Sequence, residues 1–246
     1  MSLHRYARRV NLVGHVAAAL PDGPSPEFLA GCVLPDVAAI CRVRLTGPMG
    51  ASTGASRASR ASRASAGPSL PGGIAAGVAF HHECDHAFHS SPWFNRENVR
   101  LRDALLAAGV DRGPARATAH AGLEMLLDGA LVEDPRLDGH VRVALETLDA
   151  HAGAIAALAA PPGQERWVVG VRRIADSLDP AGYADPASVT LRVQRMTAGR
   201  ARIELHADQA AAVTAVLAGA QPGIAADAHA VLAGVRRDVA AHRVEE

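Results

Sequence analysis

Apolar and polar residues follow one another along this chain with the period of α-helices rather than of strands. Long windows are rich in Ala, Leu and Arg, which favour helix, whereas Val-rich alternating runs between turns are almost absent. We therefore expect an all-α fold of about nine or ten helices, separated by Pro and Gly. The expected helices cover residues 3–20, 26–43, 74–90, 95–108, 113–131, 137–158, 165–177, 186–197, 208–218 and 223–241.

Two short features bear on these boundaries. Pro35 falls inside the second range and is expected to distort that helix. Arg200–Leu205 alternates in polarity, but a segment this short does not decide between an extended and a turn conformation.

One segment departs from the helical pattern. From Thr46 to Gly73 the chain is rich in Gly, Ser and Pro, repeats Ser-Arg-Ala three times in tandem and has no sizeable apolar cluster. Such a segment buries too little surface to order itself, so we expect a flexible insertion at 46–73 within a single domain spanning 1–246. Its arginines fit a mobile flap over an anionic substrate, but a solvated, dispensable loop is the commoner case.

Composition excludes several classes of protein. The 246 residues carry 25 basic side chains, all Arg, and 25 acidic ones, and this zero net charge argues against a general nucleic-acid binder. Apolar stretches end well before the ~18 residues of a membrane span, and the N-terminus lacks a signal peptide's apolar region, so we expect a cytoplasmic protein. Without Lys there is no Walker loop, no GxSxG motif occurs, and the cysteines form no CxxC pair.

Histidines and acids recur at helical spacing within otherwise apolar stretches. GVAFHHECDHAFH at 77–89 and HAGLEMLLDGAL at 120–131 each place three of them at i, i+4 and i+8, which forms a column on one helix face. Burying such groups is costly unless something compensates them, and a metal ion held between facing helices does so. The predicted metal ligands are His15, Asp36, His81, Asp85, His89, His120, Glu124 and Asp128.

Taken singly, these residues have commoner roles. Asp36 after Pro35 suits a cap or turn, and His15 suits a hydrogen-bonded core histidine. The same spacing on two helices favours a metal centre, with one or two divalent ions chosen from Mn, Fe and Zn. His82 and His86 fall on a neighbouring helix face and are the candidate acid and base catalysts.

Four short blocks, in order along the chain, resemble the acyl-carrier-protein phosphodiesterases. They are Asn11-x-x-x-His15, a Gly-x-x-x-x-Asp unit ending at Asp36, GVAFHHECD at 77–85 and LEMLLDGAL at 123–131. That family is similar in turn to the HD-domain phosphohydrolases, which are all-helical metal enzymes. The resemblance therefore implies an HD-domain-like fold whose metal-centred core is formed by His15, Asp36, His81, Asp85 and Asp128.

The chain also departs from the family's motifs. The family has Arg, an acid, Asp and His at the positions that here carry His82, His89, Glu124 and Gly129 respectively. The resemblance implies a metal-dependent phosphohydrolase that cleaves a phosphodiester, such as the link between 4'-phosphopantetheine and acyl carrier protein. Its partner would be that carrier protein or a phosphorylated small molecule.

Two alternatives stay open at this point. The altered positions fit a non-catalytic relative that binds a metal or a carrier protein without turnover. The Pro35-Asp36 unit is similar to one in zinc-dependent phospholipase C enzymes, which implies a phospholipid substrate instead.

Overall fold

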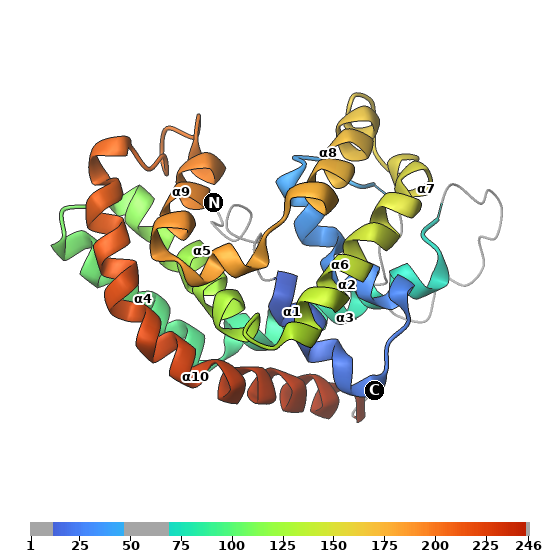
Figure 1. Cartoon of the computed structure of the whole chain (residues 1–246), viewed down its shortest axis with the longest axis horizontal. Coiled ribbons are helices and arrows are strands. Elements are labelled where there is room, and N and C mark those ends of the chain that lie inside the picture. Colours follow the sequence, from blue (N-terminus) through green and yellow to red (C-terminus); the bar gives the residue numbers. More distant parts are fainter. Residues whose placement is uncertain (1–11, 47–68, 245–246) are drawn as a thin grey trace, which may run out of the picture. The chain divides into compact units, whose positions relative to one another are not determined.

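The structure, a computed structural model, describes residues 12–46 and 69–244 (Figure 1). Over these residues the chain forms ten α-helices and three short 3-10 helices, and its only β-type pairing is one isolated bridge between Leu45 and Ala159. The predicted all-α class is therefore confirmed. Arg200–Leu205 forms turns and coil. Of the predicted insertion at 46–73, residues 47–68 lie outside the described ranges.

Backbone contacts divide the chain into two compact units, each built from separate segments. In its described part, unit 1 comprises residues 12–18, 84–138 and 179–244, and unit 2 comprises 19–46, 69–83 and 139–178. Three helices contribute residues to both units, namely α3 (Gly72–Ser90), α6 (Pro135–Ala150) and, by its last residue alone, α1 (Leu12–Ala19). The single-domain organisation stays a prediction.

Unit 1 is built around α5, whose residues from Ala121 to Gly129 are all buried. The helices α4, α9 and α10 and the short helix η3 all pack against α5 (Figure 1). This burial explains why α5 carries apolar residues on every face along its second half. The elements of unit 1 are α1 (Leu12–Ala19), α4 (Pro92–Ala107), α5 (Arg112–Leu131), η3 (Pro180–Ala184), α9 (Pro186–Thr197), η4 (Ala207–Gln209) and α10 (Ala210–Val244).

The last helix corrects the sequence prediction. Helices at 208–218 and 223–241 were expected as separate elements, but α10 is continuous over 35 residues with Pro222 inside it. Pro interrupts one backbone hydrogen bond of a helix, yet Leu217 and Ile224 are buried on either side of it. Packing of α10 against α4, α5 and α9 therefore outweighs the local preference for a break.

Unit 2 holds a close crossing of α2 (Pro26–Ile40) and α3 at two glycines. A Cβ atom on Gly31 would lie 2.1 Å from the carbonyl oxygen of Ile74, and one on Gly77 would lie 2.0 Å from that of Phe28. The two backbones thus touch directly, which only Gly permits. Pro35 lies inside α2, as predicted. The remaining elements are η2 (Leu20–Asp22), α7 (Ala152–Ala156) and α8 (Gly163–Ser177).

The predicted helix at 137–158 is wrong as a single element. It divides at His151 into α6 and α7, and His151 has non-helical backbone angles there. Among the described helices, none combines the length and the apolar character that a membrane crossing needs.

Candidate metal centre

Three of the predicted ligands meet in unit 1, where the end of α3 faces α5. His89 Nε2 lies 2.9 Å from Glu124 Oε1, and His120 Nε2, one helical turn before Glu124, lies 3.0 Å from the same oxygen. Each residue offers one ligand atom, and these atoms lie within 4.8 Å of one another. Two imidazoles and one carboxylate in this arrangement could hold a metal ion. We call His89, His120 and Glu124 the metal cluster.

The polar atoms of the metal cluster are incompletely satisfied by protein groups. Glu124 is only 2% exposed, and its Oε2 atom has no hydrogen-bond partner in the described part of the chain. His120 Nε2 approaches Glu124 without the geometry of a hydrogen bond. A buried carboxylate oxygen without a partner is unfavourable, and a cation between these atoms would satisfy it. The donor set therefore fits a divalent transition metal.

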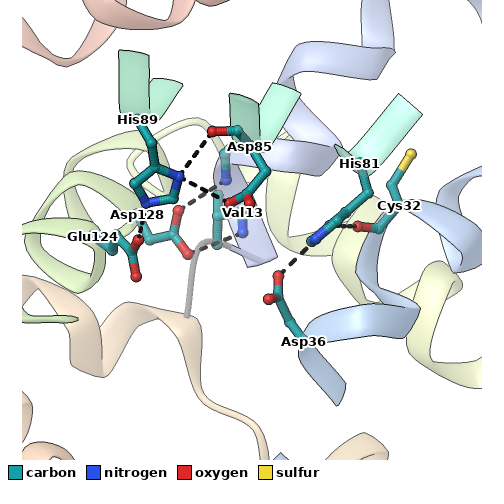
Figure 2. A network of polar contacts seen from close by, with 9 residues as sticks. Val13, Cys32, Asp36, His81, Asp85, His89, Glu124 and Asp128 are labelled. Carbon is teal, nitrogen blue, oxygen red and sulfur yellow. Dashed lines mark hydrogen bonds and ion pairs between the residues drawn. The ribbon is translucent and has the colours of Figure 1, made fainter. Parts of the chain in front are cut away.

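Asp85 stands behind His89, on the side of the ring away from Glu124 (Figure 2). His89 Nδ1 lies 2.8 Å from the backbone oxygen of Asp85 and 3.1 Å from its Oδ1 atom. A carbonyl and a carboxylate only accept hydrogen bonds, so Nδ1 carries the proton and donates it. Nε2 is the nitrogen that faces Glu124.

Protonation of the cluster follows from these contacts. Burial alone lowers the pKa of His89, but hydrogen bonds and charge from Asp85 and Glu124 outweigh it and raise that pKa to about 10. Burial of Glu124 raises its pKa, yet the charge of the neighbouring His120, together with the charge and the hydrogen bond of His89, leaves it lowered overall. Without a metal, a protonated His89 thus balances an ionised Glu124.

Ring contacts with each other and with Phe94 fix the orientation of the two imidazoles. The rings of His89 and His120 stack with centroids 5.0 Å apart and planes 15° from parallel. Phe94 of α4 meets both edge-on, at 4.7 Å from His89 and 5.2 Å from His120. The side chains of His89 and His120 nevertheless stay 23% and 18% exposed, so solvent reaches the two histidines of the metal cluster.

Asp128, one turn beyond Glu124 on α5, has a different partner. Its Oδ2 and Oδ1 atoms accept hydrogen bonds from the backbone N–H groups of Val13, at 3.1 Å, and Gly14, at 2.8 Å, in the first turn of α1 (Figure 2). Asp128 is fully buried, and α1 carries the buried His15. Asp128 therefore anchors the N-terminus of α1, where its negative charge is favourable.

Gly129 on α5 lies too close to the backbone of η3 for any larger side chain. A Cβ atom there would lie 2.4 Å from the backbone carbonyl carbon of Tyr183 in η3. A His side chain would therefore not fit at this position.

In unit 2, Asp36 and His81 lie close together, and both are 4% exposed. His81 Nδ1 donates to the backbone oxygen of Cys32 at 2.8 Å and lies 3.9 Å from Asp36 Oδ2 (Figure 2). Asp36 lies within α2 rather than at its cap, so the cap interpretation is wrong.

The two predicted acid–base histidines are both exposed on α3. His86 faces the ring of His242 on α10, with centroids 6.2 Å apart, and is not part of the metal cluster. Sequence reasoning missed Phe94, because a single aromatic residue just after a helix start carries no periodic signal.

No protein-family model, curated protein or solved structure matches this chain significantly.

Proposed function

We propose that this protein is a metal-dependent phosphohydrolase whose metal cluster binds one divalent transition metal ion. The observation that supports it is the convergence of His89 and His120 on Glu124, a buried acid with an unsatisfied oxygen. Three protein ligands of this kind leave a coordination position for water or substrate, as in zinc hydrolases. When bound, such an ion lowers the pKa of a water molecule and polarises a phosphoryl oxygen.

The protein's own groups have defined tasks in this proposal. His89 and His120 present Nε2 atoms in orientations that Phe94 and Asp85 hold, and Glu124 supplies the negative charge. Their partial exposure admits a substrate from solvent. His86, also exposed, remains the candidate acid or base for the leaving group in unit 1.

The substrate class rests on the resemblance to acyl-carrier-protein phosphodiesterases. It favours a phosphodiester such as the 4'-phosphopantetheine link of acyl carrier protein, together with an HD-domain-like fold. A cytoplasmic location fits a carrier-protein substrate.

A metal analysis with a linked activity assay tests the proposal. Untagged protein purified without chelator would be compared with Glu124→Gln and with a control, Asp103→Asn, whose exposed carboxylate pairs with Arg102 on α4. We expect about one transition metal ion per chain, lost in Glu124→Gln only. We also expect metal-dependent hydrolysis of bis-p-nitrophenyl phosphate or of holo acyl carrier protein, but not of phosphatidylcholine. Absence of metal and of turnover in the wild type would refute the proposal.

A second candidate, a non-catalytic carrier-protein-binding relative, is favoured by the backbone that fills the space at Gly129. Stable co-elution with acyl carrier protein, without product and unaffected by Asp85→Ala, would support it over the enzyme.

A further inference from the structure

Among the contacts of the described residues, the carboxylate of Asp85 meets the metal cluster at His89 Nδ1, and the following inference rests on the metal site proposed above. The resemblance assigns Asp85 as a metal ligand, but the geometry points to another role. We infer that Asp85 is a positioning residue, which fixes the tautomer and the ring orientation of His89 and leaves coordination to His89, His120 and Glu124.

The contacts of the two ring nitrogens carry this inference. Nδ1 and Nε2 point to opposite sides of an imidazole, and here Nδ1 faces Asp85 while Nε2 faces Glu124 at 2.9 Å. A carboxylate hydrogen-bonded to Nδ1 is therefore on the wrong side of the ring to share an ion with Nε2. Consistently, Asp85 is not among the residues whose ligand atoms converge in the metal cluster.

Two acceptors of the same residue act together on Nδ1. The backbone oxygen of Asp85, 2.8 Å away, is the ordinary helical carbonyl one turn before His89, and any residue at position 85 would supply it. The carboxylate oxygen at 3.1 Å adds a negative charge that only Asp or Glu brings. Histidine ligands of metals commonly donate their second N–H to such an acceptor, which increases the basicity of the coordinating nitrogen.

Metal affinity and coordination, measured separately, test the inference. Zn²⁺ affinity would be determined by competition with a chromophoric chelator for the wild type, Asp85→Asn, Asp85→Ala and the control Asp103→Asn. We expect about 10- to 100-fold weaker binding for both Asp85 variants, with Asn weakened less than Ala because its amide oxygen still accepts from Nδ1, and no change for the control.

The absorption spectrum of bound Co²⁺ distinguishes positioning from ligation. At saturating Co²⁺, a positioning role predicts the same ligand-field spectrum for the wild type and both Asp85 variants, because all three protein ligands remain. Loss of a ligand in Asp85→Ala, seen as a changed ligand-field spectrum, would overturn the inference. So would Asp85 variants that bind Zn²⁺ as tightly as the wild type.

These outcomes separate the inference from the proposed function. Wild-type protein that binds neither Zn²⁺ nor Co²⁺ overturns both. If the wild type binds both ions and the Asp85 variants bind Zn²⁺ with the same affinity, only the positioning role of Asp85 is overturned. Asp85→Asn preserves the size of the side chain, so the test stands even where Asp85→Ala folds poorly.

Discussion

At the scale of single residues, His89 links the metal cluster to pH. Its pKa of about 10 in the folded, metal-free protein exceeds the ordinary value of 6.5 because two carboxylates face its ring. Folding therefore favours the proton on His89. The stabilisation is fully present below about pH 6.5 and is lost as the pH rises through about 10.

This behaviour predicts a pH-dependent effect of His89→Gln. In the presence of chelator, the substitution should lower the free energy of unfolding by a few kcal/mol near pH 6, and by progressively less toward pH 10. Urea unfolding followed by circular dichroism at several pH values would measure the difference. A difference that is constant between pH 6 and 10 would show that the His89 proton does not contribute.

Metal binding should show the opposite trend with pH. Coordination through Nε2 requires release of its proton, so apparent Zn²⁺ affinity should rise by up to about tenfold per pH unit below the pKa of His89. Competition titrations between pH 6 and 8 would measure the slope. A flat profile would mean that His89 does not coordinate the ion.

Sequence spacing predicted which histidines and acids lie on the same helix face, but it did not predict which residues of other helices they contact. His120 and Glu124 do share a face of α5, as their spacing indicates. Asp128 continues that column in sequence, yet it bonds to the first turn of α1. The spacing of residues in the sequence predicts which of them share a helix face. Tertiary packing determines which neighbouring helix contacts each turn of that face, and the spacing does not predict this.

Asp128→Ala tests whether Asp128 serves to hold α1 in place rather than to bind the metal. Removing the carboxylate leaves the buried N–H groups of Val13 and Gly14 without their acceptor, which should cost about 2 to 4 kcal/mol in the free energy of unfolding. Zn²⁺ affinity of the folded protein should stay unchanged, since Asp128 is outside the metal cluster. Denaturant unfolding and metal competition, with Asp103→Ala as control, would measure both. A variant that folds normally but loses metal would instead make Asp128 a ligand.

At the scale of elements, periodicity located most helices and failed where packing overrides local preference. The expected range 186–197 is reproduced by α9, and 113–131 begins one residue after α5 does. Pro222 suggested a break that α10 does not have, because buried residues on both sides of it keep the helix in place. His151, by contrast, interrupts a helix without any Pro or Gly at that position. Helix propensity alone therefore predicts neither the continuous helix at Pro222 nor the interruption at His151.

The crossing of α2 and α3 makes a prediction at the element scale. Gly77→Ala would place a methyl group 2.0 Å from the Phe28 carbonyl oxygen, so the two helices must separate. We expect a loss of about 1 to 3 kcal/mol in the free energy of unfolding. Gly72→Ala is the matched control, because a Cβ at the start of the same helix meets nothing within 4 Å. Equal stability of the two variants would contradict the close crossing.

At the scale of the whole molecule, the division into two units bears on how the chain unfolds. The metal cluster belongs to unit 1, whereas Asp36 and His81 belong to unit 2. Ligand binding stabilises only the part of a protein that unfolds together with the site. A bound metal ion should therefore raise the Tm of only those unfolding transitions that include the metal cluster. Counting these transitions tests whether the predicted single domain unfolds as one cooperative structure.

Calorimetry of the metal-free and Zn²⁺-loaded protein supplies that measurement. A single cooperative domain should show one transition, and a Zn²⁺ concentration about 100 times Kd should stabilise it by about 2.7 kcal/mol, or roughly 5 to 11 °C in Tm for a chain of this size. Two transitions, of which only one moves with Zn²⁺, would assign unit 1 and unit 2 as independent folding units. Glu124→Gln should abolish the shift in either case, because its loss of charge removes one ligand without exposing the surrounding core. If Zn²⁺ still raised the Tm of Glu124→Gln, the stabilising ion would bind away from the metal cluster. The chemistry assigned to His89 and His120 would then have to be moved to that other site.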